Sequence, residues 1–503
     1  MNRRLIATVL ASALLSGCGS TVQLRGTAAV GGDGLTQQGA GTGAGDLGST
    51  SGGTGTGGIG GTSSTGTAGT SGQPGSGAGA ATSGGGSVGG TSGGGTESSA
   101  GDRTPVEVGI LLFPDLDKFA QAFGSTVDTG NQTLITDTAV SWVNAHGGLA
   151  GHPMKVIKHN VSLTSSDTYD QMAQQACQDF TVDHKVAIAI APGTAVSNNF
   201  AACLQKAGVQ LLMSGHWMHD AKDWQQFPNL WSANEPDMGS VAQAMVDQII
   251  NRKLAKAGGK VGLMTMTEPA GVRAANDVLK PKLKAAGIDV VEYTVPPPAS
   301  TADISNSVAV VNSAELRMAS EQIQTVLFLC PGCFSFFVRQ ANSQQYYPRY
   351  LGSSLDTPVG IKDSEYDRSM QSAIMIGWQP HQDVGLYSHP QELTDNPNRK
   401  LCHTIMDPIK QSSGDASEFA TQVICDSFLQ VKRAAELNAV RPLNGPAFRE
   451  GMGRFGTGFP CALNYTTNLT PSLHGGVTSY RTMHWDSSKL VFVYDSPRRL
   501  PFS

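Results

Sequence analysis

From Val106 onward the sequence alternates short apolar runs with longer stretches of helical periodicity. The first run, Val106–Leu112, leads into a helical pattern that ends at Gly147 and Gly148. The alternation then repeats, with strands expected at 154–159, 186–191 and 209–213 and helices at about 167–182 and 195–207. Short apolar runs between amphipathic helices predict a parallel sheet with helices on both faces. The expected fold class is therefore α/β.

A second series of strands and helices follows a crossover near residues 231–234. Strands are expected at 260–265, 289–294, 325–329 and 349–352, and helices at 237–257, 271–286, 303–319 and 334–343. The run 373–377 is interpreted as a strand returning towards the first lobe, 396–455 as helical, and 478–485 and 490–494 as two final strands. A chain of 503 residues favours two lobes over one core. We expect a first lobe of 104–233 with 380–470, and a second of 234–379 with 471–503.

The first eighteen residues have the pattern of an export signal. Arg3 and Arg4 form a charged end, and Leu5–Leu14 is too short an apolar run to span a bilayer. The following Leu-Ser-Gly-Cys18 resembles a lipidation site, at which the cysteine is acylated and the signal removed. The alternative is an ordinary secretory signal with a chance cysteine. We expect a lipoprotein anchored at Cys18 on an extracytoplasmic membrane face, at the cell surface or in the periplasm.

Residues 19–103 are almost entirely glycine, serine, threonine and alanine. Such a segment cannot bury enough apolar surface to offset its ordering entropy, so it is expected to be a disordered tether. Its root-mean-square reach as a flexible chain is roughly 50 Å. The whole chain has 35 basic and 40 acidic residues. This balance argues against a nucleic-acid partner, which would need a basic face.

Two disulfides are expected, because export permits them. With right-handed crossovers and a strand order of 2-1-3-4, the second and third helices lie side by side on one face. These helices carry Cys177 and Cys203, which we pair; the alternative is two separately buried thiols. Cys402 and Cys425 are expected to join two helices of the C-terminal part.

Three further cysteines, Cys330, Cys333 and Cys461, have no pairing fixed by the sequence. Cys330-Pro-Gly-Cys333 lies after a strand and before a helix, the layout of a thiol-redox motif. The surrounding elements are not those of a small thioredoxin-like sheet. A structural disulfide that rigidifies the loop is the favoured interpretation.

The order strand, loop, long helix, followed by the sequence VNAHGGLAGHPMKV at 143–156, resembles a known family. It is similar to the start of the leucine/isoleucine/valine-type substrate-binding proteins of ABC transporters, which are periplasmic binding proteins of type I. The resemblance implies two doubly wound parallel-sheet lobes joined by a multi-strand hinge. It further implies a monomer without a cofactor, which binds a small solute between its lobes and delivers it to an ABC permease.

Ligands bind outside the carboxyl ends of strands in open sheets of this kind. In the first lobe this selects Phe113, Thr194 with Ala195, and Gly215 with Trp217. Thr194 begins a helix, where a hydroxyl and free N–H groups can meet a carboxylate. The resemblance places it at a Ser or Thr that holds the ligand's carboxylate; the alternative is a plain helix cap. The resemblance also aligns Gly215 and Trp217 with the next ligand-contacting loop, where Trp217 either stacks on a ligand ring or fills volume.

In the second lobe the resemblance selects Ala270 and Asp356. Asp356 is the acid available to meet an ammonium group, and Ala270 stands where the family often has an aromatic residue. That difference argues against an ordinary branched-chain amino acid as the solute. His216 and His219 are expected to be satisfied or exposed rather than metal ligands, since no third ligand has suitable spacing.

Three classes of function fit these features to different degrees. A solute-binding lipoprotein of an ABC importer explains the anchor, the tether and the two lobes together. A ligand-sensing module for a membrane receptor shares the fold but would need a downstream partner. An exported thiol-disulfide protein depends on the Cys330–Cys333 motif alone. No Ser-His-Asp signature or phosphate-binding loop supports an enzyme, and the sequence names neither the solute nor the permease.

Overall fold

The structure is a computed structural model that describes residues 104–118, 128–193, 198–215, 217–362, 364–410, 414–438 and 442–502. The expected export signal, Cys18 and the tether at 19–103 lie outside the described residues. The same is true of Thr194, Ala195 and His216. All of the described residues belong to one compact unit of the chain, which includes Ala100–Ser503.

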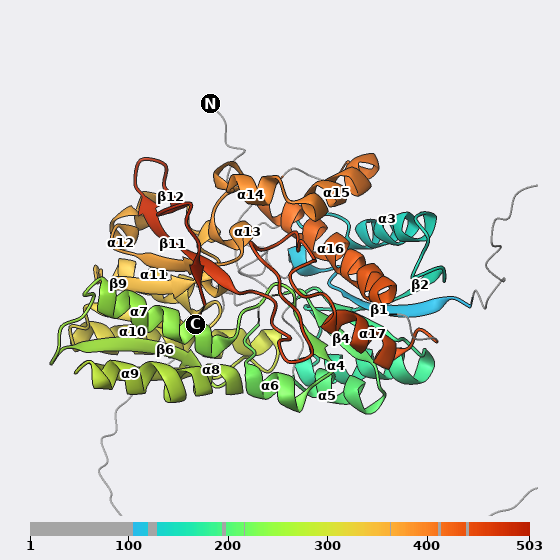
Figure 1. Cartoon of the computed structure of the whole chain (residues 1–503). Coiled ribbons are helices and arrows are strands. Elements are labelled where there is room, and N and C mark those ends of the chain that lie inside the picture. Colours follow the sequence, from blue (N-terminus) through green and yellow to red (C-terminus); the bar gives the residue numbers. More distant parts are fainter. Residues whose placement is uncertain are drawn as a thin grey trace, which may run out of the picture. The chain divides into compact units, whose positions relative to one another are not determined.

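A five-stranded parallel sheet organises the first part of this unit (Figure 1). Its strands are β1 (Val106–Leu112), β2 (Met154–Asn160), β3 (Ile188–Ala191), β4 (Gln210–Met213) and β5 (Leu230–Trp231). They lie in the order β2-β1-β3-β4-β5, so the expected order 2-1-3-4 is confirmed. Every residue of β3 and β4 is buried, as expected for parallel strands covered on both faces.

Helices cover both faces of this sheet. They are α3 (Gln132–Ala145), α4 (Tyr169–Gln178) with the π turn η1 (Asp179–Asp183), α5 (Asn198–Lys206), α6 (Ala221–Gln226), α15 (Pro397–Met406), the 3-10 turn η8 (Asp407–Ile409), α16 (Asp415–Leu437) and α17 (Gly445–Gly453). Side chains of a strand alternate between faces. Accordingly Val108 and Ile110 of β1 pack in the core that contains α3 and α16, whereas Leu111 packs in the core with α4 and α5.

Both expected disulfides are confirmed. Cys177 and Cys203 join α4 to α5 with their Cα atoms 6.3 Å apart, and Cys402 and Cys425 join α15 to α16 across 5.8 Å. Cys330 and Cys333 are also disulfide-bonded, which agrees with the structural interpretation of that motif. Cys461 is a free, buried thiol.

The second sheet has eight strands. They are β6 (Lys260–Met266), β7 (Asp289–Val295), β8 (Thr325–Leu329), β9 (Arg349–Ser353), β10 (Ile374–Gly377), β11 (Ser479–Asp486), β12 (Val491–Tyr494) and β13 (Leu500–Pro501). Their order is β12-β11-β10-β9-β8-β6-β7, with β13 paired to β11. The strand expected at 373–377 is β10 of the second sheet, between β9 and β11, and the chain returns towards the first lobe directly after it.

The helices around the second sheet correspond closely to those expected. They are α7 (Met238–Asn251), α8 (Pro269–Arg273), the π turn η2 (Ala274–Leu279), α9 (Lys280–Ala285), η3 (Thr301–Asp303), α10 (Ile304–Ser320), α11 (Cys333–Ser343), η4 (Ser354–Asp356), η5 (Pro358–Gly360), η6 (Ser364–Tyr366) and α12 (Asp367–Met370). Helix α7 ends at Asn251 rather than at 257, because Lys253 adopts the left-handed backbone conformation (φ 54°).

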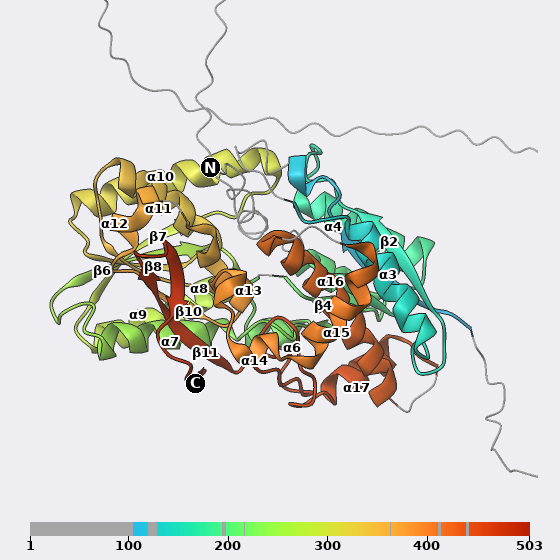
Figure 2. The ribbon, with the colours of Figure 1, turned by 90° about the horizontal axis from the view of Figure 1, so that it is seen from above.

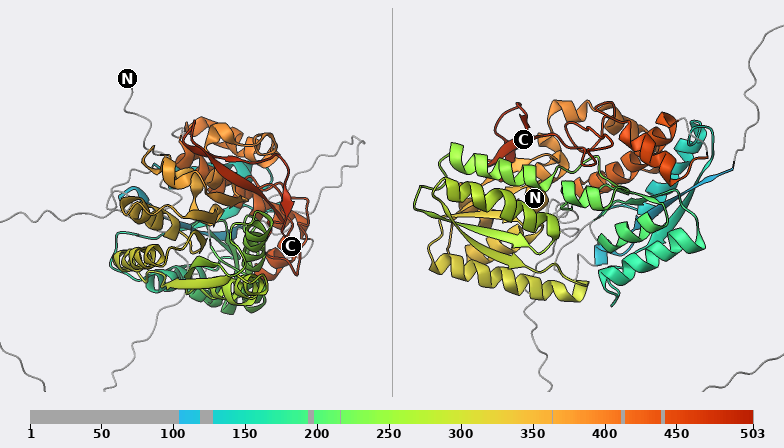
Figure 3. Two further views of the ribbon diagram at one scale, coloured as in Figure 1. Left: turned by 90° about the vertical axis from the view of Figure 1, so that its left-hand side faces the viewer. Right: turned by 60° about the horizontal axis from the view of Figure 1, so that its bottom comes forward.

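Three segments run between the two sheets and form the hinge (Figure 3). Ser232 N–H donates to the carbonyl of His474 (2.9 Å), and Gly476 N–H donates to the carbonyl of Ser232 (2.7 Å). Gln379 Nε2 donates to the carbonyl of Asn234 (2.8 Å). Gln379 leads into α13 (Pro380–Asp383), η7 (Leu386–Ser388) and α14 (Gln391–Thr394), from which the chain returns to the first sheet. The described fold therefore consists of two doubly wound sheets joined by a multi-strand hinge, as the sequence analysis expected.

Candidate functional site

The loops that follow β3 and β4 lie against each other at the carboxyl ends of those strands. A Cβ atom at Gly215 would be 2.9 Å from the carbonyl carbon and oxygen of Gly193. Only glycine fits at Gly215 without a shift of the backbone. This contact brings the segment that leads to Thr194 beside the segment that carries Gly215, although Thr194 and Ala195 themselves lie outside the described residues.

Phe113 lies directly after β1 and is buried in the core. Its N–H donates to Oε1 of Gln132 (3.0 Å), and Nε2 of Gln132 donates back to its carbonyl (3.3 Å). Gln132 is the first residue of α3, so the helix holds the strand end in place. The buried ring makes Phe113 part of the packing beneath the candidate site.

Trp217 is half-buried and is held by a buried ion pair. Its N–H donates to Oε1 of Glu235 (3.2 Å), and Oε2 of Glu235 lies 3.0 Å from Nδ1 of His219. Burial alone would lower the pKa of His219, but the hydrogen bond and charge of Glu235 outweigh it and raise the pKa. His219 is thus satisfied by a carboxylate, as the sequence interpretation expected. Glu235 lies in the hinge segment, so the pair links the Trp217 loop to the hinge.

On the second sheet, Ala270 and Glu268 follow β6. Ala270 is buried in the first turn of α8, and Glu268 is the residue before that helix. Burial raises the pKa of Glu268. A Cβ atom on Gly271 would lie 3.2 Å from Sδ of Met218, so this turn approaches the Trp217 loop of the first lobe closely.

Asp356 is buried at the end of η4. Its Oδ2 accepts the Ser353 N–H (2.8 Å), while its Oδ1 has no hydrogen-bond partner among the residues described. Burial raises the pKa of this carboxyl well above its usual range. Nearby Ser354 ties the same turn to the hinge, because its hydroxyl donates to Oδ1 of Asp383 (2.7 Å) and accepts the Trp378 N–H (2.8 Å).

The lobes contact each other on two sides. On one side Tyr169 N–H donates to the carbonyl of Ala299 (2.9 Å), and the Thr301 hydroxyl donates to the carbonyl of Leu163 (2.6 Å). These residues follow β2 and β7, so they come from the carboxyl ends of both sheets. The contacts show that the two sets of strand-end loops meet.

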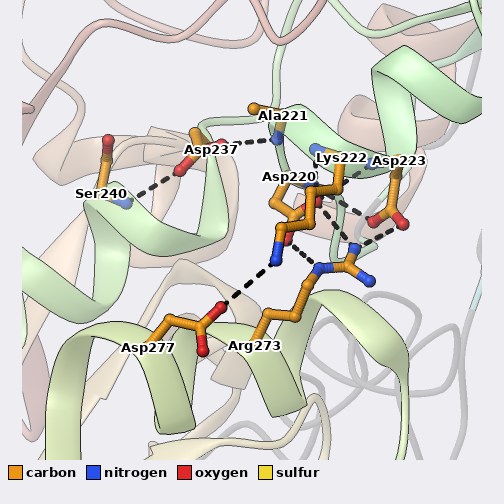
Figure 4. A network of polar contacts seen from close by, with 8 residues as sticks. All are labelled: Asp220, Ala221, Lys222, Asp223, Asp237, Ser240, Arg273 and Asp277. Atoms are coloured by element: carbon orange, nitrogen blue, oxygen red, sulfur yellow. Dashed lines mark hydrogen bonds and ion pairs between the residues drawn. The ribbon is translucent and has the colours of Figure 1, made fainter. Parts of the chain in front are cut away.

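On the other side Arg273 of α8 binds two carboxylates of the first lobe (Figure 4). Its Nε and Nη2 lie 2.5 and 2.7 Å from the Asp220 carboxylate, and Nη2 lies 2.6 Å from Oδ1 of Asp223. Asp220 also caps α6 by accepting the Lys222 and Asp223 N–H groups. Burial alone would raise the pKa of Asp220, but Arg273 and the backbone donors outweigh it and lower the pKa.

The sequence interpretation did not find Glu235, Arg273 or the polar residues of α16 described below. A carboxylate at the start of α6 could have been recognised from the Asp220-x-x-Asp223 spacing, which is typical of a helix cap. Nothing in the local sequence indicates that Arg273 is its partner. In the described part of the chain, no cluster of three His, Cys, Asp or Glu side chains is arranged to hold a metal ion.

A match to a protein family and a likeness to solved structures relate the chain to known proteins. Residues 132–365 match the family described as periplasmic binding protein, so the resemblance inferred from the sequence is confirmed. No curated protein sequence matches the chain. Among the described helices, none has the length and apolar character needed to cross a membrane.

Solved structures with a similar fold are substrate-binding proteins of ABC transporters. One is from Aeropyrum pernix, with a TM-score of 0.57 and 12% identity over 80% of this chain and 96% of that chain. A solute-binding protein from Rhodopseudomonas palustris in complex with 3,4-dihydroxy benzoic acid has a TM-score of 0.56 and 14% identity over 79% and 98%. A branched-chain amino acid ABC transporter structure from Thermus thermophilus with bound valine has a TM-score of 0.54 and 12% identity over 80% and 97%. At these identities the likeness concerns the fold.

Proposed function

We propose that this chain, whose residues 132–365 belong to the periplasmic binding protein family, is an extracytoplasmic solute-binding protein of an ABC importer. The observation that carries the proposal is the meeting of strand-end loops from two doubly wound sheets across a three-segment hinge. Ligands of such sheets bind at the carboxyl ends of the strands, so a solute there would contact both lobes. We take 104–233 with 380–470, and 234–379 with 471–503, as the two lobes.

The proposed solute is a small carboxylate, either amino-acid-like or another small acid. Thr194 would hold its carboxylate, with Gly215 and Trp217 beside it, and Asp356 would meet a donor from the second lobe. The Rhodopseudomonas palustris and Thermus thermophilus structures contain 3,4-dihydroxy benzoic acid and valine, which are both carboxylic acids. The small Ala270 favours a solute other than an ordinary branched-chain amino acid.

The mechanism proposed is closure of the lobes around the solute without covalent chemistry, so the chain is not an enzyme. A solute that touches both lobes binds the closed form more tightly than the open form, and this difference shifts the equilibrium. Cys330 and Cys333 do not support thiol chemistry, because both are buried and bonded to each other. A ligand-sensing role uses the same closure; genes for a permease and an ATPase beside this one would favour import.

Replacing Thr194 with alanine is expected to weaken solute binding. A hydrogen bond to a charged group contributes about 1.5–3 kcal/mol, which corresponds to roughly a 10- to 150-fold loss of affinity. Calorimetric titration with 3,4-dihydroxybenzoate, L-valine and L-isoleucine as first probes measures this, with small-angle scattering recorded with and without solute. Thr138→Ala on the exposed face of α3 is the control. Equal affinities would remove Thr194 from the site, and an unchanged radius of gyration at saturation would count against closure.

The anchor is proposed from Cys18 and the tether that follows it. Several acyl chains hold a lipoprotein stably, whereas one chain binds a membrane only marginally. Cys18→Ser is therefore expected to move the protein from the membrane to the soluble extracytoplasmic fraction. Fractionation of cells that express the wild type and this variant measures the change. A variant that stays as membrane-bound as the wild type would contradict the anchor.

A further inference from the structure

Helix α16 is buried along most of its length but is not apolar. A helix surrounded by protein is normally hydrophobic on all sides. In α16 six buried residues are polar: Ser417, Thr421, Gln422, Asp426, Ser427 and Gln430. Keeping polar groups inside a protein costs free energy unless each finds a hydrogen-bond partner. The partners of these residues therefore indicate what the helix does.

In the C-terminal half of α16 each buried polar side chain makes at least one hydrogen bond, although Oε1 of Gln430 has no partner among the described residues. The Ser427 hydroxyl donates to the carbonyl of Val423 and lies 2.7 Å from the hydroxyl of Ser214. The Asp426 carboxylate accepts from Asn398 (3.2 Å) and Gln430 (2.9 Å). The contacts with Ser214 and Asn398 join this half of α16 to the end of β4 and to α15.

In the N-terminal half of α16, two buried polar side chains make no hydrogen bond to the described part of the chain through their hydroxyl groups. Ser417 and Thr421 are 1% and 4% exposed, and neither hydroxyl has a hydrogen-bond partner among the described residues. The two residues are four apart, so they lie on the same side of the helix. Gln382 of α13 is 0% exposed, and both atoms of its side-chain amide lack a partner in the same part of the chain.

Two contacts of α16, made by Lys432 and Ser427, show where Ser417 and Thr421 lie relative to the first sheet. Lys432 Nζ donates to the carbonyls of His146 and Gly148, so the C-terminal ends of α16 and α3 lie together. Ser214 follows β4 and precedes Gly215, so Ser427 marks the level at which the strands of the first sheet end. Thr421 is six residues further towards the helix start, about 9 Å along the axis at ~1.5 Å per residue.

The N-terminal half of α16 therefore extends past the strand ends towards the hinge and α13 (Figure 2). The rings of Phe419 on α16 and His381 on α13 are 6.3 Å apart, which places the two helices in contact there. Thr421 thus lies about 9 Å along the helix axis from Ser427, which bonds Ser214 beside Gly215, and this length is comparable with that of a small solute. A solute of that length would span the interval from the strand-end loops to this end of α16.

In the described part of the chain, the acid next to these three groups is already paired. Glu418, the acid beside Ser417, is bound by Arg399 Nη2 (3.0 Å) and lies 3.1 Å from Nε2 of His403. A hydroxyl or an amide both donates and accepts hydrogen bonds without a net charge. The three side chains are therefore suited to bind a neutral group that forms hydrogen bonds.

We propose that Ser417, Thr421 and Gln382 form a subsite for a hydroxyl or amide group at the end of the solute opposite its carboxylate. The inference rests on the proposed solute-binding function and narrows its substrate class. The solute is a small acid whose far end is hydroxylated or carries an amide, rather than one that ends in a bare aliphatic or aromatic group.

Calorimetric titration of the full chain with matched pairs of solutes tests the proposed substrate class. The pairs are L-threonine with L-valine, L-asparagine with L-leucine, and 3,4-dihydroxybenzoate with benzoate. The polar member of at least one pair is expected to bind about 3- to 10-fold more tightly, the effect of one hydrogen bond of ordinary strength. Thr421→Val and Ser417→Ala are each expected to remove that preference while leaving the apolar member within about twofold.

The same variants have a second readout, which a merely structural role would not give. Replacing an unpartnered buried hydroxyl by a methyl group or a hydrogen is expected to leave the melting temperature of the solute-free protein unchanged or higher. Thr404→Val removes a hydroxyl bonded to the carbonyl of Lys400 on α15 and is the control; it should change neither affinity.

The outcomes separate the subsite from the function it rests on. If the apolar members bind as tightly as the polar ones, or if the variants weaken both members of a pair equally, the subsite is wrong and solute binding stands. If none of the six compounds binds, the proposed binding of a small acid is contradicted, and the proposed subsite is contradicted as well. A lowered melting temperature with unchanged preference assigns these hydroxyls to packing and overturns the inference.

Discussion

Replacing Arg273 with methionine is expected to lower the free energy of unfolding by about 3–5 kcal/mol. The variant removes the only cation bonded to Asp220 and Asp223 in the described structure, and the Asp223 side chain is 3% exposed. Without Arg273 the buried carboxylate still carries the free-energy cost of desolvation but no longer has the ion pair that offsets it. Urea unfolding followed by tryptophan fluorescence measures the difference. Arg273→Lys is expected to lose less, since a lysine keeps the charge but cannot form the two-pronged contact.

Lys222 provides a matched control in the same network (Figure 4). Its Nζ lies 3.5 Å from Asp277, and the two side chains are 66% and 59% exposed. An exposed pair of this kind contributes about 0–1 kcal/mol, so Lys222→Met should change stability little. Asp223→Asn added to Arg273→Met should recover part of the loss. Equal and small effects of Arg273→Met and Lys222→Met would contradict the assignment of Arg273 as a buried tie between the lobes.

The sequence predicted both sheets well because parallel strands buried on two faces appear as short, continuous apolar runs. The run Thr325–Leu329 is observed as β8 with the bounds expected. The run at 373–377 was predicted as a strand of the second lobe, but its neighbours in the sheet were not predicted. A strand of four residues, Ile374–Gly377, carries little information about its neighbours. Its place between β9 and β11 depends on segments about a hundred residues apart along the chain.

The part of the candidate site that lies at the carboxyl ends of the strands could be predicted, because ligands of open parallel sheets bind there. Gly215 was selected in this way, and its close approach to Gly193 explains the need for glycine. The ion pair of His219 with Glu235 and the contact of Arg273 with Asp220 involve residues that local patterns do not connect. The polar residues of α16 did leave a signal, since Ser417 and Thr421 recur at helical spacing. That signal becomes meaningful only once burial of the helix is known.

Glu315 is expected to make the protein less stable as the pH rises from about 4.5 to about 7. It lies on α10 on the same inward stripe as Val311 and Met318, with 0% exposure and no hydrogen-bond partner for either carboxylate oxygen among the described residues. Burial raises its pKa from 4.5 to about 7. The folded state therefore binds the proton more tightly than the unfolded state does. The stabilisation is complete below pH 4.5 and is lost as the pH rises through about 7.

Comparison with Glu315→Gln isolates this effect, because other buried acids such as Asp383 and Asp426 also titrate in the wild type. Glutamine keeps the size and polarity of the side chain but does not ionise, so the wild type should lose about 1–3 kcal/mol relative to the variant between pH 5 and pH 8. Glu315→Met also removes the unpartnered polar atoms and should be more stable than the wild type at both pH values, with the larger gain at pH 8. Urea unfolding at the two pH values measures these differences. A constant difference between the wild type and Glu315→Gln would mean that the Glu315 carboxylate finds a partner or water in solution and ionises at its ordinary pKa.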